Sequence, residues 1–508
     1  ILKTQGWISK NILGDYSSTL ELKLKKYRIM RNKILFFILL TFCLGLSAQH
    51  RMANTAVTEQ TGKKVSKLLK TNHRMLNPIS PPGVYIADPE ARQMPDGRVY
   101  VYGSRDEPTN VWCSHTYDVL STSDLINWDV EQFSFATKGI GKQVDYTDQL
   151  LYAPDCIYHN GKYYLYYCLT NEKEDEGVAV SSSPYGPFKE GKAIAGIHGI
   201  DPSVFIDDDG QAYLFWGQAN AKGAKLSKDM LSIEGEVHEK LLTYQEHAFN
   251  EGSSVRKRNG IYYYVYAGHQ RHGESNCATL NYATATSPLG PYTYRGVIID
   301  NWGSDRNLVN NHGSIAEIDG QWYIFYHRPT HASSSMRKVC MEPIVFNPDG
   351  TINEVEMTTQ GCGGPINPLL RMDAARACLL SGHTTVVVRR PAHSNPVEYL
   401  SAIRNGDCAY WKYFDFTGME VNSFICKTWG KNAAGTIEIR LDKPDGELIG
   451  TCELQPMNGD VAYSVHRTKV KPVTGVHALV LVFKNNDPSM TGQDFMNLEW
   501  FMFENHDR

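Results

Sequence analysis

The sequence predicts an all-β protein in which a five-bladed β-propeller is followed by a jelly-roll-like β-sandwich. Two observations predict the propeller: a Tyr-rich hairpin pattern recurs five times within residues 77–360, and a polar residue precedes the turn of each repeat. The third observation is that the repeat then stops, and short strands alternate with turns toward the C-terminus. We therefore expect a propeller over 77–360, a linker over 361–371 and a sandwich over 372–506.

Each repeat consists of an Asp-Gly or Asn-Gly turn followed by an aromatic strand. The segments are DGRVYVYGS, NGKYYLYYC, DGQAYLFWG, NGIYYYVYAG and DGQWYIFYHR, with turn glycines Gly97, Gly161, Gly210, Gly260 and Gly320. These dipeptides favour tight hairpins because both central residues of a type I′ turn have positive φ. The glycines lie 64, 49, 50 and 60 residues apart, a spacing typical of four-stranded blades with loop insertions.

A polar side chain lies six to nine residues before each turn glycine. These residues are Asp88, Asp155, Asp201, Glu251 and His312. Because the innermost strand of every blade follows the central channel, equivalent positions on five inner strands face one another. A single acid at such a position is most often a turn residue. Four acids and a histidine in phase with the five blades instead predict a shared axial pocket. Gathered carboxylates are costly unless paired, metal-bound or functional, and two of them can cleave a glycosidic bond.

Composition argues against nucleic acid as a partner. The chain of 508 residues has 51 Lys and Arg against 55 Asp and Glu, a formal net charge of −4. Its 29 Tyr and 9 Trp suit sugar rings, although we expect most of them to pack within sheets. The cysteines form no CxxC pair, so no zinc site is predicted and any disulfide pairing stays open.

The N-terminal region has the pattern of an export signal. A basic start, MRNK, is followed by a charge-free apolar run and by LSA, a small-residue cleavage site. We interpret 30–48 as a signal peptide, 1–29 as upstream translation foreign to the protein, and 49–76 as a linker. The apolar run is shorter than the roughly 20 residues of a membrane span. We therefore expect a periplasmic or extracellular enzyme without a membrane span.

The repeat motifs resemble glycoside hydrolase family 43, the β-xylosidase and α-L-arabinofuranosidase family. The resemblance covers residues 77–360 and lies in IADPEARQMPDGRVYVYGS, LYAPDCIYHNGKYYLYY, IDPSVFIDDDGQAYLFWG, EGSSVRKRNGIYYYVY and NNHGSIAEIDGQWYIFYHR. It implies an inverting enzyme with Asp88 as general base, Glu251 as general acid, and Asp201 as the carboxylate that tunes and positions Glu251. His312 matches the axial histidine of the family, which commonly helps to hold calcium or another ion through water.

Further side chains are candidate contacts to the sugar. Arg328 follows the last Tyr-rich strand and is a candidate for the cleavage subsite, with a structural ion pair as the alternative. Tyr152 stands where the family often has Trp. Trp112 and Trp302 lie in loops, where they serve as stacking platforms or as loop packing. Asp155 matches the family motif without being a catalytic acid, so we group it with the substrate contacts and leave its role open.

The C-terminal region resembles a family 6 carbohydrate-binding module in the stretches GTIEIRLDKPDGELIGTCEL, VTGVHALVLVFK and MNLEWFMF. Trp411 and Asn497 fall near the ligand-contacting positions of that family. The second expected aromatic residue is not apparent around 458–460. The sandwich therefore either binds glycan or only braces the propeller.

The sequence thus predicts an exo-acting, inverting hydrolase of hemicellulose or pectin side chains. The sugar released is α-L-arabinofuranose, favoured by the attached module, or next β-xylose, from an oligo- or polysaccharide such as arabinoxylan or arabinan. No cofactor is required, and the resemblance adds a structural Ca²⁺ at the axis. One alternative is a non-catalytic glycan-binding propeller, which would not need all three acids. The other is a retaining fructosidase, which usually has Arg-Asp-Pro and Glu-Cys where this chain has Ile200-Asp201-Pro202 and Glu251-Gly252.

Overall fold

The computed structural model describes residues 76–505 except for a few positions within that range. The exceptions are 108–110, 140, 172, 274–275, 307–309, 431–432, 458 and 460–461. The predicted upstream segment 1–29, the signal peptide 30–48 and the linker up to residue 75 lie outside the described residues. Within the part of the chain that is described, no helix combines the length and the apolar character needed to cross a membrane.

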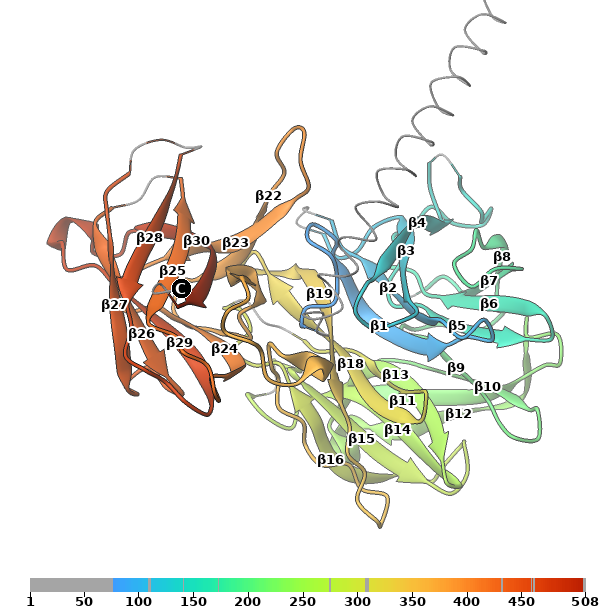
Figure 1. Cartoon of the computed structure of the whole chain (residues 1–508). Helices are drawn as coiled ribbons and strands as arrows, with labels where there is room; N and C mark the ends of the chain where they lie inside the picture. The colour runs from blue at the N-terminus through green and yellow to red at the C-terminus, as the bar shows by residue number, and fades with distance from the viewer. Residues whose placement is uncertain are drawn as a thin grey trace, which may run out of the picture. The chain divides into compact units, whose positions relative to one another are not determined.

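Five antiparallel sheets follow one another along the chain, four with four strands and the last with three. The innermost strands β1, β5, β9, β13 and β17 contact one another in this order, and β17 contacts β1, which closes the ring. Figure 1 labels the strands of these sheets apart from β17 and colours them from blue to yellow along the chain. The five-bladed propeller is therefore confirmed. The strands are β1 (Ile86–Gln93), β2 (Val99–Arg105), β3 (Thr116–Thr122), β4 (Asp129–Ala136), β5 (Asp155–His159), β6 (Lys162–Tyr167), β7 (Gly177–Ser181), β8 (Lys189–Ala193), β9 (Ser203–Ile206), β10 (Ala212–Trp216), β11 (Asn220–Leu226), β12 (Ile233–Thr243), β13 (Phe249–Arg258), β14 (Ile261–Gly268), β15 (Thr279–Ala285), β16 (Thr293–Asp300), β17 (Ser314–Ile318), β18 (Gln321–Thr330) and β19 (Ser333–Pro343).

The hairpin turns between the first two strands of each blade fall into two types. Asn160, Asn259 and Asp319 have positive φ, as do the glycines that follow them, which is the predicted type I′ geometry. Gly97 and Gly210 have positive φ, but the aspartates before them do not. In these two hairpins the glycine nitrogen donates to the carbonyl oxygen three residues earlier. The turn is therefore one residue longer than a type I′ turn, and within it only the glycine adopts the left-handed conformation.

The aromatic strands fill the spaces between neighbouring blades. On β2, Tyr100 and Tyr102 pack against the second blade, whereas Val99 and Val101 pack against the fifth. This alternation is the period-2 pattern of a strand buried on both faces. The same arrangement recurs around the ring, so most tyrosines of the repeats serve as packing, as expected.

The chain entering the first blade also completes the last one. Ile79 N donates to Val339 O on β19 at 2.9 Å. Asn77 is fully buried beside the same strand: its Nδ2 donates to Met341 O at 3.0 Å and to Glu342 Oε1 at 2.8 Å, and its Oδ1 accepts from Met341 N at 2.8 Å. This segment therefore ties the two ends of the propeller together.

The C-terminal region is a β-sandwich of two sheets. One has the strand order β22-β23-β30-β25-β28 with β20 beside β30, and the other the order β21-β24-β29-β26-β27. One shared apolar core lies between them. The strands are β20 (Met372–Asp373), β21 (Leu379–Leu380), β22 (Thr385–Arg389), β23 (Val397–Ile403), β24 (Cys408–Asp415), β25 (Ser423–Trp429), β26 (Gly435–Leu441), β27 (Leu448–Leu454), β28 (Tyr463–Lys469), β29 (Val476–Lys484) and β30 (Met496–Glu504). The described helices are α2 (Tyr244–His247) and the 3-10 turns Gly361–Gly363, Ala374–Arg376 and Pro488–Met490.

The role of Asn77 in ring closure predicts a large effect of a small substitution. Asn77→Ala leaves buried donors and acceptors of β19 without partners, so we expect a loss of about 2–4 kcal/mol in the free energy of unfolding. Urea denaturation measures it. Asn127→Ala, at an exposed turn of the first blade, is the control, with an expected change of about 0.5 kcal/mol or less. Equal effects of the two substitutions would contradict this account of closure.

Candidate active site

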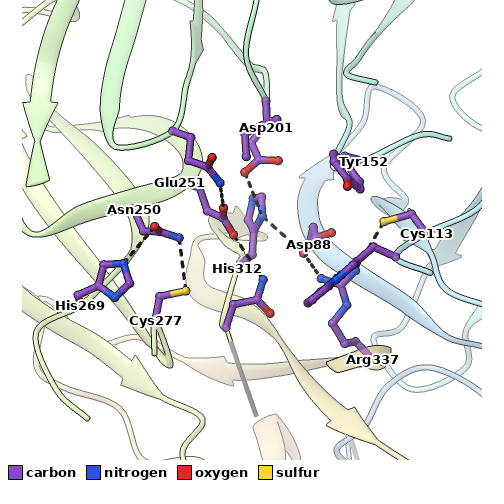
Figure 2. A pocket seen from close by; sticks show the side chains of 14 residues that line it. Asp88, Cys113, Tyr152, Asp201, Asn250, Glu251, His269, Cys277, His312 and Arg337 are labelled. Atoms are coloured by element: carbon purple, nitrogen blue, oxygen red, sulfur yellow. Dashed lines mark hydrogen bonds and ion pairs between the residues drawn. The ribbon is translucent and has the colours of Figure 1, made fainter. Parts of the chain in front are cut away.

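The inner strands enclose an axial cavity of about 360 Å³ at the end where they begin. Asp88, Asp201, Glu251 and His312 all line it, although they come from four different blades (Figure 2). The structure thus brings together the three acids and the histidine that the sequence places in phase. The remaining lining residues are Trp112, Cys113, Tyr152, Ile200, Gln218, Asn250, His269, Cys277, Asn310 and Arg337.

The local backbone aims the two aspartates at the axis. Asp88 and Asp201 both adopt the left-handed conformation, with φ of 55° and 58°. This conformation is uncommon outside glycine, but the short polar side chain of aspartate tolerates it. At Asp88 it coincides with a register shift between Ala87 and Glu90, a β-bulge that redirects the side chain. Aspartate is therefore a residue type that suits the backbone conformation at both positions.

Glu251 is placed by a similar irregularity in the fourth blade. The register of β13 shifts between Glu251 and Ser254, and Gly252 has a φ of 79°. A Cβ atom at Gly252 would lie 3.1 Å from the His312 ring, so this position requires glycine both for its conformation and for the close approach. The motif EGSS thereby brings the carboxylate and the histidine side by side.

Asp88 is an ionised carboxylate held by a buried cation. Arg337 Nη1 donates to its Oδ1 at 2.8 Å, and Ser104 Oγ donates to its Oδ2 at 2.5 Å. Burial alone would raise the pKa of Asp88, but Arg337, the neighbouring histidines and Ser104 outweigh it and lower the pKa to about 2. Arg337 also donates to Asp106 through Nε at 2.9 Å and Nη2 at 3.0 Å, which fixes its orientation.

The two axial histidines are neutral near pH 7. His327 Nδ1 accepts from the backbone N–H of Asp88 at 3.2 Å, which leaves Nε2 as the protonated nitrogen, 3.2 Å from Asn310 Oδ1. Burial lowers the pKa of His327 to about 3, and it also lowers the pKa of His312. Arg337 is consequently the cation that keeps Asp88 ionised near pH 7, and the histidines contribute only at low pH, where they are protonated.

Asp201 has the opposite environment. It is buried, accepts from Gly252 N at 3.0 Å, and its nearest cationic candidate is His312 Nδ1 at 3.8 Å. Burial raises the pKa of Asp201 well above its usual range, and the negative charges of Glu251 and Asp88 raise it further. The cavity therefore holds an ionised carboxylate on one side and a proton-retaining carboxyl group beside Glu251 on the other.

Two carboxamides hold the carboxylate of Glu251. Gln218 Nε2 donates to its Oε2 at 2.8 Å, and Asn310 Nδ2 donates to its Oε1 at 3.4 Å. These neutral donors orient the carboxylate without placing a cation beside it. Glu251 is therefore positioned to exchange a proton with a bound molecule.

Asp155 lies in the next layer along the axis, not in the cavity. It is fully buried and accepts two hydrogen bonds from Arg92, at 3.1 Å and 2.6 Å. In the same layer Arg256 Nη2 lies 2.7 Å from Glu90 Oε2. The prediction of Asp155 as a substrate contact is wrong: its carboxylate is fully buried in the ion pair with Arg92 and does not line the cavity.

Arg328 is also outside the cavity. Its Nη2 donates to Tyr326 Oη at 2.7 Å and to Thr358 O at 2.5 Å, and lies 3.8 Å from Glu342. The prediction of a sugar contact is wrong, and the structural alternative describes it. Successive side chains of a strand point to opposite faces, so on β18 His327 faces the axis and Arg328 does not.

The predicted aromatic contacts separate into two groups. Tyr152 and Trp112 line the cavity, and the guanidinium of Arg337 lies 4.8 Å from the Trp112 ring centre. Trp302 does not line it; its ring stacks on His272 at the rim of the fourth blade. Of the two loops that carry these tryptophans, only the loop with Trp112 lines the cavity.

Several pocket residues carried no signal that sequence reasoning used. Arg337 belongs to the third strand of the last blade, outside any repeated motif. Ser104, Cys168 and His327 each stand seven residues after a turn glycine. Ser104 and His327 contact Asp88, and Cys168 accepts from Asp201 N at 3.2 Å. The positions seven residues after the turn glycines therefore form a second set in phase with the repeat, and the sequence shows this set. Arg337 belongs to no such set, so the sequence does not indicate it.

The described residues do not fit a directly coordinated metal ion. None of the described side chains of His, Cys, Asp and Glu form a group of three or more placed to hold one. His312 Nδ1 already lies 3.5 Å from Asp88, and the next axial layer contains the guanidinium groups of Arg92 and Arg256, whose positive charge disfavours a cation there. A Ca²⁺ ion held through water at His312 stays a prediction.

Comparison with known proteins identifies the family. Residues 75–352, more than half of the chain, match the glycosyl hydrolases family 43. The chain belongs to this family. The family 43 propeller is thus a glycoside hydrolase. Residues 381–505 match the carbohydrate binding module (family 6), which covers the β-sandwich.

Curated relatives of family 43 align along most of their length. The arabinoxylan arabinofuranohydrolase of Bacillus subtilis is 28% identical over 92% of this chain and 97% of its own. A xylosidase/arabinosidase of Thermoclostridium stercorarium is 29% identical over 81% of this chain and 96% of its own. A solved structure of the Bacillus subtilis family 43 arabinoxylan arabinofuranohydrolase, with cellotetraose, covers 85% of this chain and 99% of its own at 26% identity, with a TM-score of 0.49.

The two predicted ligand contacts of the sandwich differ in position. Trp411 is fully buried in the core, with its ring 4.7 Å from that of Phe501, so the prediction of a ligand contact is wrong: β24 turns this side chain inward. Asn497 is partly buried, accepts from Ser401 Oγ at 2.8 Å and donates to Trp429 O at 3.2 Å. Its role in binding stays a prediction, and positions 458 and 460 of the segment without an apparent aromatic lie outside the described residues.

The raised pKa of Asp201 predicts a stability that depends on pH. In the unfolded chain Asp201 loses its proton above about pH 4, whereas in the folded protein it retains the proton to higher pH. The free energy of unfolding of the wild type therefore falls as pH rises from about 4 toward the pKa of Asp201 in the folded state. Asp201→Asn removes that penalty. We expect the melting temperature of the variant to exceed that of the wild type by about 3 °C or more at pH 7.5, and by less at pH 4. Asp209→Asn, in an exposed turn, is the control; a gain that is equal at both pH values would contradict the prediction.

Proposed function

We propose that this family 43 enzyme is an exo-acting, inverting hydrolase that releases a terminal pentose, preferentially α-L-arabinofuranose, from plant cell-wall polysaccharide. The observation that supports this most strongly is the unequal environment of the acids in one closed pocket. Asp88 is paired with Arg337, whereas Glu251 is held by neutral amides beside the proton-retaining Asp201. One side of the pocket is suited to accept a proton and the other to donate one.

In the proposed reaction, hydrolysis proceeds by a single displacement. Asp88 takes a proton from a water molecule as that water attacks the anomeric carbon. Glu251 gives a proton to the leaving glycosidic oxygen, and Asp201 lies beside it as the second member of a carboxyl pair. Asp88 and Glu251 belong to the first and fourth blades, on different sides of the axis, and inversion needs room for a water between sugar and base.

Buried side chains between the inner strands support exo action. Arg92 forms a buried ion pair with Asp155, and Arg256 forms one with Glu90; none of these four residues lines the cavity. The cavity of about 360 Å³ is near the small end of the range of about 300–1,000 Å³ for ligand pockets. A terminal sugar unit can enter such a pocket, whereas an internal unit of a chain would need two open ends.

The names of the relatives support a pentose and leave two candidates. Arabinofuranose is favoured because two of the three relatives that align with 80% or more of this chain are arabinoxylan arabinofuranohydrolases. β-Xylose is the second candidate, since other relatives are a xylosidase/arabinosidase and a beta-xylosidase. Action on a polymer outside the cell is consistent with the export signal that the sequence predicts at 30–48.

The proposal is tested with paired substrates and one substitution. Glu251→Gln removes the general acid, so we expect a loss of about 10²–10⁴-fold in kcat/KM on arabinoxylan. The loss should be much smaller on an arabinofuranoside with a dinitrophenolate leaving group, which departs without protonation. Steady-state kinetics on arabinofuranosides and xylosides also decides the sugar.

The matched control is Glu246→Gln, an exposed glutamate on α2. It should leave both rates unchanged. An equal loss on the two leaving groups in Glu251→Gln would remove Glu251 from the role of general acid. Absence of wild-type activity on arabinofuranosides and xylosides alike would rule out the proposed pentosidase function.

A further inference from the structure

Trp302 is an exposed tryptophan outside the catalytic pocket. It follows β16, between the fourth and fifth blades, and 47% of its surface is exposed. Its ring lies parallel to that of His272, with 4.2 Å between the ring centres and an angle of 7°. Leaving this much indole in water forgoes hydrophobic stabilisation. Stacking on His272 covers one face of the indole, and the ring remains partly exposed to solvent.

The stacked pair is anchored from below by charged groups. Asp300 accepts from Trp302 N at 2.9 Å through Oδ1, and its Oδ2 lies 2.8 Å from His272 Nε2. Arg271 lies 3.5 Å from Asp300 and donates to both oxygens of Glu354, at 2.6 Å and 2.7 Å. The indole is therefore held in one orientation before any ligand arrives, which lowers the entropic cost of stacking against it.

A polar cavity lies directly beside the indole. It has a volume of about 190 Å³ and contains the exposed Arg306 next to the aromatic ring, together with Asp305, Ser381 and Thr384, whose side chains already hydrogen-bond within the protein. Its lining residues are Trp302, Gly303, Asp305, Arg306, Leu380, Ser381, Gly382 and Thr384. An aromatic face bordered by hydrogen-bonding groups suits a pyranose ring, whose C–H face is apolar and whose hydroxyl groups point outward.

The segment that carries Trp302 is linked by hydrogen bonds to a residue that contacts the general acid. Asn301, next to Trp302, donates through Nδ2 to Asn310 O at 3.2 Å and to His327 O at 2.8 Å. Asn310 in turn donates to Glu251. A general acid contacts the leaving oxygen, so the part of the substrate that departs lies on the Glu251 side of the pocket. The polysaccharide backbone that carries the pentose is therefore the group that reaches this rim.

We propose that Trp302, backed by His272, is a subsite that stacks against a pyranose ring of the polysaccharide backbone. This inference rests on the proposed function, because it takes the departing group to be a polymer. It assigns Trp302 to recognition of the polymer and not to the chemistry on the pentose.

Kinetics on a polymer and on a small substrate test the assignment. We expect Trp302→Ala to lower kcat/KM on arabinoxylan about tenfold, mainly through KM, and to leave kcat/KM on 4-nitrophenyl α-L-arabinofuranoside within about twofold. Trp302→Phe keeps a smaller aromatic face and should retain part of the polymer activity. Tyr185→Ala, an exposed tyrosine of the second blade, is the control and should change neither rate.

Two outcomes would overturn the subsite. Unchanged kinetics on arabinoxylan would show that the indole does not contact the polymer, and an equal loss on both substrates would show that its role is structural. A binding measurement separates this inference from the proposed function. In the Glu251→Gln background, Trp302→Ala should reduce retardation by arabinoxylan in affinity electrophoresis. If the wild type shows no pentosidase activity but Trp302→Ala still reduces retardation, the subsite stands and the proposed function fails. Unchanged retardation would overturn the subsite.

Discussion

The chemistry of the pocket depends on one buried guanidinium. Arg337 is 2% exposed and is the only guanidinium in the described lining of the axial cavity. It binds Asp88 and Asp106 together, so a carboxylate that burial would protonate stays ionised. Among the described residues Asp201 has no cationic partner at hydrogen-bond distance, and burial beside Glu251 and Asp88 raises its pKa well above the usual range. A single cation placed on one side of the axis thereby distinguishes acids that the sequence presents as equivalent.

The propeller explains how residues from distant parts of the chain reach this cation. Each blade begins beside the axis, and irregular backbone at Asp88, Asp201 and Gly252 turns three carboxylates into one space. Closure of the ring at Asn77 keeps the first and last blades adjacent. That adjacency is what places Arg337 of the fifth blade against Asp88 of the first.

The sequence was sufficient to predict the blades, the three acids and His312, because turn dipeptides and strand aromatics repeat with a readable period. It did not predict which face of a strand a given side chain occupies, or how deep along the axis it lies. Arg328 lies one position past the phase that His327 occupies, and Asp155 is aligned with the acids in the sequence yet does not line the cavity. Trp411 shows the same limit in the sandwich, where an alternating pattern does not tell which face is the core. Arg337 had no repeated motif around it, so only the tertiary structure could place it.

The most direct test of the central claim is the configuration of the sugar first released. Proton NMR of a wild-type reaction on an α-L-arabinofuranoside, recorded before mutarotation, identifies that anomer. A base at Asp88 acting on water from the face opposite Glu251 predicts β-L-arabinofuranose as the initial product, by inversion. Initial release of the α anomer would show retention through a covalent intermediate and would contradict the assignment of Asp88 as a general base.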